Sequence, residues 1–156
     1  MGQIRLERCE RTGQKLSLAI VDMDDFKQVN ERHGHLVGDE VLRRVGRALR
    51  ESVRPYDAVG RYGGDEFALV AVDADESAAC EMVGRAIEQV SVSLAELDAA
   101  SGCEAATAGV AEWHSGESVT ALIDRADRAL LHGKHRGARG GGLRASEIVA
   151  DRVSVA

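Results

Sequence analysis

The chain has 156 residues and a formal net charge of −6, with 44% hydrophobic and 29% charged residues. This length suits one domain with a substantial core, and the composition is that of an ordinary globular protein. The acidic balance argues against general nucleic-acid binding, and no apolar run has the length of a membrane span or the form of a signal peptide.

The first half of the chain predicts four elements. Residues 3–13 predict the end of a helix, with Gly13 as its C-cap. A strand is expected over 16–22, followed by a short helix near 24–32. A four-residue hydrophobic repeat then predicts an amphipathic helix that ends at Pro55. The repeat consists of Val37, Val41, Val45, Leu49 and Val53.

The second half alternates between strand and helix patterns. The expected order is strands at 57–61 and 66–72, a helix at 75–93, a loop at 94–102, a strand at 103–112 and a helix from 119 to about 133. Alternating strands and helices predict an α/β fold in which helices flank one sheet.

A glycine-rich tract follows the last predicted helix. It contains Gly137, Gly140, Gly141 and Gly142, and the residues after it have no strong period. The tract has no strand before it and no clear helix after it, so it is a poor candidate for a phosphate-binding loop. We predict a flexible exit, with a domain at 1–143 and a tail at 144–156.

The three cysteines indicate the redox environment. Cys9, Cys80 and Cys103 are odd in number and far apart in the sequence. This pattern favours reduced thiols over a disulfide framework or a zinc site. We therefore expect a cytoplasmic protein.

The most informative motif runs from Arg61 to Phe67 and reads Arg-Tyr-Gly-Gly-Asp-Glu-Phe. Paired glycines adopt positive φ without steric cost, so they suit the tip of a two-residue β-hairpin. Asp65 and Glu66 would then lie at a turn, backed by the apolar strand that follows. Such an acidic tip suits a metal or phosphate site, although an ordinary surface turn also fits these letters alone.

A second acidic cluster follows the strand predicted at 16–22. The chain continues there as Asp22-Met23-Asp24-Asp25-Phe26-Lys27. Carboxylates crowded at a strand end repel one another, and a hard divalent cation is the usual compensation. Asn30 and the segment Gly34-His35-Leu36-Val37-Gly38-Asp39 come next.

Together these segments resemble the GGDEF family, the diguanylate cyclases that condense two GTP into cyclic di-GMP. The family reads Asp-x-Asp-x-Phe-Lys-x-x-Asn, then Gly-His-x-x-Gly-Asp, then Arg-Tyr-Gly-Gly-Asp-Glu-Phe, and every letter is present in order. The stretch from Ala126 to Leu130, followed by Lys134, resembles a further family segment, so the resemblance covers about residues 6 to 140. It implies a nucleotidyl-cyclase-like α/β fold, with a central five-stranded sheet, flanking helices and a β-hairpin carrying the Gly-Gly-Asp-Glu-Phe motif.

The resemblance also implies a set of catalytic carboxylates. Asp22 and Asp65 would ligate Mg²⁺ or Mn²⁺, and the Met23 carbonyl would complete the protein ligands. Glu66 would lie beside them in either a structural or a metal-adjacent role. The alternative interpretation of Asp22 is a helix cap at a strand end.

Guanine recognition is implied for Asn30 and Asp39. A carboxylate accepts hydrogen bonds from guanine N1–H and N2–H₂, which adenine does not offer as a pair. Without the resemblance, both residues would be read as solvated or capping side chains. The expected substrate is therefore GTP.

Phosphate binding is implied for the backbone amides of Asp24–Phe26 and for the side chains of Lys27 and Lys134. The family commonly has arginine four residues after that second lysine, whereas this chain has Ala138. The arginines nearest to that position, both out of register, are Arg136 and Arg139.

An inhibitory site is implied by Arg54-Pro55-Tyr56-Asp57, which resembles the family's Arg-x-x-Asp site for cyclic di-GMP. Arg54 can pair bidentately with phosphate or guanine, and Asp57 with a guanine edge. Arg85 matches a third family position that completes this pocket across two domains. Product inhibition is expected, and a surface salt bridge is the alternative interpretation.

The family's opening Asp-x-Leu-Thr-Gly-Leu turn is absent from the start of this chain, which reads Met1-Gly2-Gln3-Ile4. We expect either a truncated chain or a protein degenerate at its start, with an upstream sensory or dimerising domain missing. Catalysis in the family needs two domains face to face, each bringing one GTP. We therefore expect a transient homodimer with low, concentration-dependent activity. The alternative is a weak or inactive domain that binds GTP or cyclic di-GMP and signals without turnover.

Overall fold

The computed structural model describes residues 2–97, 103, 105–137 and 140–145. Five helices and five strands fall within these residues. In chain order they are α1 (Gly2–Thr12), β1 (Leu16–Met23), α2 (Phe26–His33), α3 (His35–Glu51), β2 (Ala58–Arg61), β3 (Glu66–Val72), α4 (Glu76–Ala95), β4 (Ala106–Glu112), α5 (Val119–His135) and β5 (Gly141–Arg144). None of the described helices is long and apolar enough to cross a membrane.

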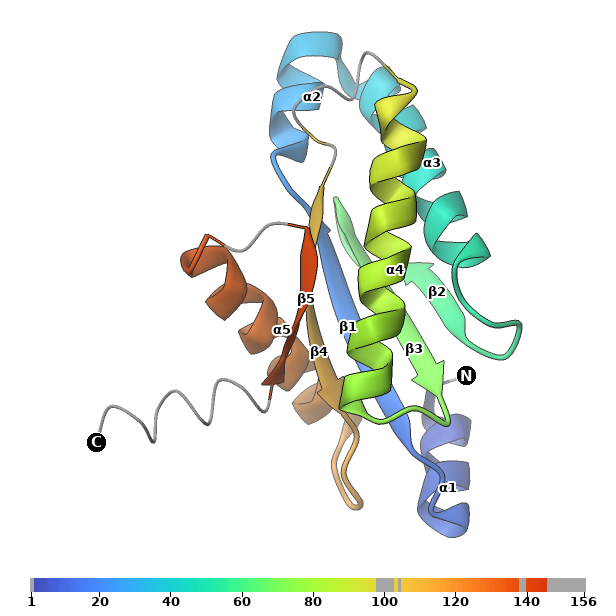
Figure 1. The fold of residues 1–156 in the computed structure, drawn as a ribbon. Coiled ribbons are helices and arrows are strands. Elements are labelled where there is room, and N and C mark those ends of the chain that lie inside the picture. Colours follow the sequence, from blue (N-terminus) through green and yellow to red (C-terminus); the bar gives the residue numbers. More distant parts are fainter. Residues whose placement is uncertain (1, 98–102, 104, 138–139, 146–156) are drawn as a thin grey trace.

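The strands form one sheet in the order β2-β3-β1-β4-β5, with β1 at its centre (Figure 1). β1 runs antiparallel to both of its neighbours, and β5 runs parallel to β4. Because the central strand has a layer of helices on each side, both of its faces are buried. Acidic residues at its carboxyl end are therefore held by a rigid support.

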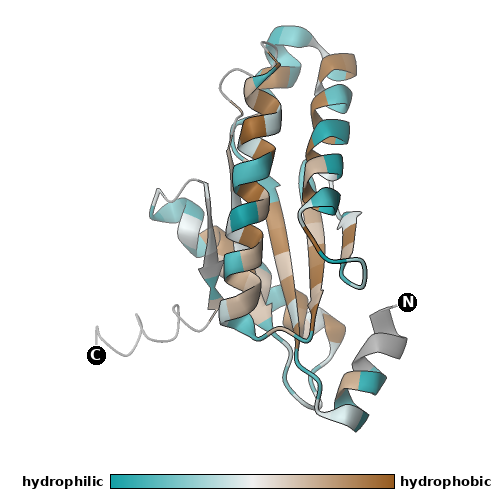
Figure 2. Cartoon of the chain, turned by 45° about the vertical axis from the view of Figure 1, so that its right-hand side comes forward, coloured by the Kyte–Doolittle hydropathy of each residue, from teal (hydrophilic) through white to brown (hydrophobic). Residues whose placement is uncertain are grey.

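Side-chain alternation divides the core into two halves. Along β1, Ala19, Val21 and Met23 pack with α2, α3 and α4, whereas residues on the opposite face pack with α5. Those opposite residues are Leu16, Leu18 and Ile20. Figure 2 shows the hydrophobic residues on the central strands and on the helix faces turned toward them.

The expected α/β fold and its order of elements are confirmed, and most bounds agree with the prediction to within a few residues. Gly13 has φ +65° immediately after α1, as the predicted C-cap requires. The last turn of α4 reaches Ala95 and buries Leu94, so the predicted loop begins later than expected.

The flexible exit predicted for the glycine tract is wrong at residues 141–144. These residues form β5, and Gly142 lies opposite Ala108 of β4. A Cβ added at Gly142 would lie 3.1 Å from the sulfur of Cys80, so a side chain there would crowd α4. The tract pairs as a strand because its backbone can approach this helix closely.

The hairpin between β2 and β3 also differs from the prediction. Its loop has four residues, 62–65, rather than two. The loop is closed by hydrogen bonds from the amides of Tyr62 and Gly63 to the carbonyl of Glu66, at 2.8 and 3.2 Å. Neither Gly63 nor Gly64 has positive φ. A Cβ at Gly63 would lie 2.5 Å from Glu66 Oε2, so space for that carboxylate explains this glycine better than backbone conformation does.

Candidate functional site

The β1–β3 pairing brings two acidic side chains together. Asp22 continues the series of β1 residues that faces α5, and its cross-strand partner is Glu66. Directly opposite residues have their side chains on the same face of a sheet. Asp22 and Glu66 therefore form a pair of adjacent carboxylates at the end of the central strand.

Helix α5 covers this carboxylate pair. Lys134 donates a hydrogen bond from Nζ to Asp22 Oδ1 and forms an ion pair with it. The start of α5 is held by Arg125, which bonds both carboxylate oxygens of Glu117 at 2.7 Å and also the carbonyl of Glu112 at the end of β4. The helix is thus anchored at one end to the sheet and delivers its lysine to Asp22 at the other.

Two carboxyl groups at this end of the sheet have perturbed pKa values. Burial raises the pKa of Asp22 above its ordinary value, and only the hydrogen bond and charge of Lys134 oppose that effect. Burial also raises the pKa of Glu66, and the charges of Asp22, Asp127 and Asp65 raise it further. Both groups therefore lack sufficient positive charge in their surroundings.

The residues present fit a hard divalent cation. Asp65 lies one residue before β3, and its carbonyl accepts a hydrogen bond from the Met23 amide at 3.3 Å, which fixes it beside the end of β1. Carboxylate and carbonyl oxygens are the ligands that Mg²⁺ prefers. No group of three His, Cys, Asp or Glu side chains among the described residues is gathered as a ready metal site. The metal ligands expected from the family resemblance include only two carboxylates, those of Asp22 and Asp65, together with the Met23 carbonyl.

A pocket of about 330 Å³, called the nucleotide pocket after its expected ligand, opens beside these acids. It is lined by Phe26, Lys27, Asn30, His35, Asp39, Leu42, Arg61, Gly64 and Asp65. Five residues predicted from the sequence thus converge, namely Phe26, Lys27, Asn30, Asp39 and Asp65. Lys134 does not line this pocket but lies at Asp22, and the residues of the expected inhibitory site are not among its lining residues either.

The position of Asn30 depends on the absence of a side chain at Gly38. A Cβ added to Gly38 would lie 2.0 Å from Asn30 Oδ1 and 3.1 Å from Phe26 Cζ. Such distances are far below van der Waals contact, so the amide of Asn30 occupies the space that any larger residue would need. Gly38, the second glycine of the Gly-His-x-x-Gly-Asp segment, therefore leaves the space that the Asn30 side chain occupies.

The turn between β1 and α2 is fixed by Asp24. Its carboxylate accepts hydrogen bonds from Thr107 Oγ1 at 3.0 and 3.1 Å, and its amide donates to the Ala105 carbonyl at 3.0 Å. Asp25 then adopts a left-handed conformation with φ 59° and leads into Phe26 at the start of α2. One of the amides expected to bind phosphate, that of Asp24, is therefore already engaged in this structure.

The Arg54–Asp57 loop is held from within. The Asp57 side chain is buried, and it accepts hydrogen bonds from the amides of Arg54 at 3.1 Å and Val72 at 2.9 Å. Arg54 is exposed and lies over the ring of Tyr56, 5.8 Å from the ring centroid. Asp57 therefore shapes the loop, and Arg54 is its outward-facing charge. Arg85 is exposed on α4, and no hydrogen bond or ion pair within the described chain joins it to this loop.

The sequence alone gave no role to some residues that lie at the site. The charge of Asp127 raises the pKa of Glu66. Asp127 stands seven residues before Lys134 on α5, which is about two helical turns, so the two residues lie on the same face of the helix. Thr107 binds Asp24 across the sheet, and no local pattern in the sequence indicates that contact. Ala138 and Arg139 lie outside the described residues.

The chain is similar to known proteins over most of its length. The family described as Diguanylate cyclase, GGDEF domain, matches residues 3–140. Diguanylate cyclase DosC of Escherichia coli is 38% identical over 135 residues, which cover 85% of this chain and 29% of DosC. Diguanylate cyclase VdcA of Vibrio cholerae is 38% identical over 128 residues, covering 80% of this chain and 38% of VdcA. The chain thus spans well under half the length of these relatives.

Solved structures show the same fold. The GGDEF domain of DgcB from Caulobacter crescentus, crystallised in complex with c-di-GMP, aligns with a TM-score of 0.80 and 30% identity over 91% of this chain and 85% of that chain. Diguanylate cyclase SiaD from Pseudomonas aeruginosa, solved with its activator SiaC, aligns with a TM-score of 0.80 and 37% identity over 91% of this chain and 54% of that one.

The close approach of Asn30 to Gly38 can be tested by mutation. Replacing Gly38 with Ala should displace the Asn30 side chain and weaken GTP binding about tenfold, because the purine edge loses a hydrogen-bonding partner. Folding should survive, since alanine is favoured over glycine in a helix by about 1 kcal/mol. Calorimetric titration with a non-hydrolysable GTP analogue and thermal denaturation measure the two effects.

The matched control is Gly84→Ala on α4, where an added Cβ meets no atom within 4 Å. That variant should bind the analogue as the wild type does. Wild-type affinity in the Gly38→Ala variant would contradict the placement of Asn30 in the nucleotide pocket.

Proposed function

The chain belongs to the diguanylate cyclase GGDEF domain family, and we propose that it condenses two molecules of GTP into cyclic di-GMP with release of two pyrophosphates. One juxtaposition carries the proposal. The carboxylates Asp22 and Glu66, paired across two strands, adjoin Asp65, which itself lines a pocket containing Asn30 and Asp39. Acidic groups suited to a cation and polar groups suited to guanine thus meet at one edge of the sheet.

Substrate selection follows from the chemistry of the pocket. The Asp39 carboxylate accepts hydrogen bonds only, so it pairs with the N1–H and N2–H₂ donors of guanine. The Asn30 amide both donates and accepts, and it can bind the N2 and N3 edge of the same base. Adenine would leave the Asp39 oxygens without donors, which disfavours it strongly. GTP is therefore the proposed substrate.

A Mg²⁺ or Mn²⁺ ion held by Asp22, Asp65 and the Met23 carbonyl would supply neutralisation of the charge on the phosphate oxygens. Lys27 lines the nucleotide pocket, and Lys134 lies at Asp22, so each brings positive charge to the edge where the phosphates are expected. Glu66 and Asp127 add negative charge behind Asp22 and so favour retention of a cation.

The reaction is a phosphoryl transfer repeated twice. The 3′-hydroxyl oxygen of one GTP bonds to the α-phosphorus of the other, and the bond from that phosphorus to the bridging oxygen of the pyrophosphate breaks. The hydroxyl proton is lost to the surroundings, and the electron pair of the broken bond leaves with pyrophosphate. Such reactions depend on positioning and charge neutralisation, and the residues named above are of the types that provide both.

A second domain must supply the second nucleotide, because the proposed pocket binds one guanine. The described chain therefore acts as one half of a transient homodimer. An upstream sensory or dimerising domain would raise the local concentration of the two halves. For the chain alone, the rate should depend steeply on protein concentration.

Product inhibition is proposed at the loop that carries Arg54. The arginine is exposed and can bind a phosphate or the guanine O6 and N7 edge of cyclic di-GMP. Asp57 is buried, and both of its carboxylate oxygens accept hydrogen bonds from backbone amides, so its part is to position Arg54. Arg85, exposed on α4, would complete the pocket from a neighbouring domain.

Turnover is the direct test of the proposed activity. The purified chain at high concentration, with GTP and Mg²⁺ or Mn²⁺, should form cyclic di-GMP at a rate that rises faster than linearly with protein. Chromatographic separation of the nucleotides measures it. Asp65→Ala should reduce the rate at least a hundredfold, because it removes a proposed cation ligand in the reacting complex.

Asp124→Ala is the matched control, since Asp124 is an exposed acid on α5 that does not line the nucleotide pocket. It should keep the wild-type rate. Equal turnover by Asp65→Ala and wild type would contradict the ligand assignment. Nucleotide binding without any product would favour the alternative function, a binding module that signals without turnover.

Inhibition by cyclic di-GMP has a separate test. Arg54→Ala should raise the inhibitory concentration of cyclic di-GMP at least tenfold while leaving the initial rate unchanged, because a charge-assisted contact is lost outside the nucleotide pocket. Arg128→Ala, which removes an exposed arginine of α5, is the control. Unchanged inhibition in Arg54→Ala would place the inhibitory site elsewhere.

A further inference from the structure

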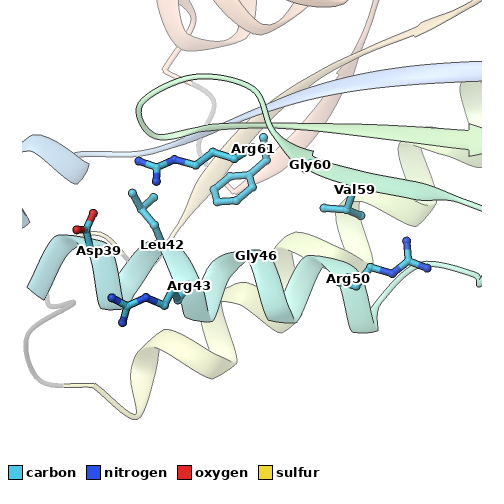
Figure 3. A pocket seen from close by; sticks show the side chains of 9 residues that line it. Asp39, Leu42, Arg43, Gly46, Arg50, Val59, Gly60 and Arg61 are labelled. Atoms are coloured by element: carbon cyan, nitrogen blue, oxygen red, sulfur yellow. The ribbon is translucent and has the colours of Figure 1, made fainter. Parts of the chain in front are cut away.

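A second and larger hollow lies beside the nucleotide pocket, between α3 and the β2–β3 hairpin (Figure 3). This α3–hairpin groove has a volume of about 560 Å³. It is lined by Asp39, Leu42, Arg43, Gly46, Arg50, Val59, Gly60, Arg61 and Phe67. Asp39 and Arg50 stand eleven positions apart on α3, so the groove follows that helix for roughly 16 Å.

The charges of the groove favour an anion. Three arginines and one aspartate line it, in a chain whose net charge is −6. The hydrogen bonds that the structure gives Arg50 and Arg61 all go to backbone carbonyls, and within the described residues neither forms an ion pair. Carbonyls orient these guanidinium groups without neutralising them. Figure 3 shows Arg61 reaching from the hairpin toward Leu42 and Asp39, with Arg50 at the other end of the groove.

The floor of the groove is apolar. Leu42, Val59 and Phe67 supply hydrophobic surface, and glycines stand on both walls at positions 46 and 60. A Cβ at Gly46 would lie 3.4 Å from Phe67 Cε1, so the glycine leaves this part of the floor open. An apolar floor between cationic rims suits a planar ring that carries a phosphate.

We propose that the α3–hairpin groove is a second ligand site, which binds a purine nucleotide with its ring over Gly46 and its phosphates at Arg43 and Arg61. A hollow of this volume is of the size that holds small organic ligands. Arg43 pairs with Glu40 at 2.5 Å, but this pair is largely exposed, so Arg43 can turn to a stronger anion. The site stands apart from the proposed condensation reaction, since it needs neither the cation nor a second domain.

The groove and the nucleotide pocket share Asp39, Leu42 and Arg61, but each has residues of its own. Asn30 lines only the nucleotide pocket, whereas Arg43 and Gly46 line only the groove. The floor of the groove offers no polar group that would distinguish purines. Adenine nucleotides, which the nucleotide pocket should reject, are therefore suitable probes of the groove.

The test is a titration of the chain with ADP in the absence of divalent cations, followed by amide chemical shifts in NMR spectra. ADP at millimolar concentrations should bind saturably and shift the amides of Gly46 and Gly60. Arg43→Gln should weaken binding about tenfold through loss of a charged hydrogen bond. Gly46→Ala should also weaken it, because the added methyl group fills the floor while favouring the helix.

Two controls separate this site from its surroundings. Arg44→Gln removes the same charge from the other side of α3 and should leave the affinity within about twofold. Asn30→Ala should also keep ADP binding. No saturable binding would overturn the proposal, and so would binding that Asn30→Ala abolishes and Arg43→Gln does not affect. Neither result depends on whether cyclic di-GMP is formed.

Discussion

The adjacency of Asp22 and Glu66 on one face of the sheet is the constraint on which the site depends. The pairing of β1 with β3 holds these carboxylates side by side. Burial raises the pKa values of both, and the charges of neighbouring aspartates raise them further. Lys134 gives partial compensation from α5, a helix that Arg125 anchors to the end of β4. Negative charge that the fold holds in place, with too little positive charge nearby, is the physical basis for expecting a divalent cation at this edge.

Glycines in this chain act mainly by leaving space. Gly38 accommodates the Asn30 amide, Gly63 accommodates the Glu66 carboxylate, and Gly46 keeps the groove beside α3 open. None of these three has positive φ, so backbone conformation does not explain them. The motif glycines at positions 38 and 63 therefore provide room for neighbouring polar side chains.

The fold was largely predictable because hydrophobic periodicity reports local structure directly, as at α3 and β3. β5 was not predictable, since a glycine tract has no periodicity and pairs through backbone contacts alone. The convergence of Asn30, Asp39 and Asp65 on one pocket follows the family resemblance, which indicated all three. The pairing of Lys134 with Asp22 and the inward position of Asp57 were not anticipated, because both depend on contacts between elements that lie far apart in the sequence.

Binding of Mn²⁺ to the chain without nucleotide, followed by the loss of the free-ion signal in electron paramagnetic resonance, tests this electrostatic account most directly. Binding should be saturable, and Asp22→Asn should weaken it at least tenfold, since one negative ligand is lost. Lys134→Gln should tighten binding, because the lysine competes with the ion for Asp22. Equal affinities in all three proteins would contradict the claim that these carboxylates are arranged to hold a cation.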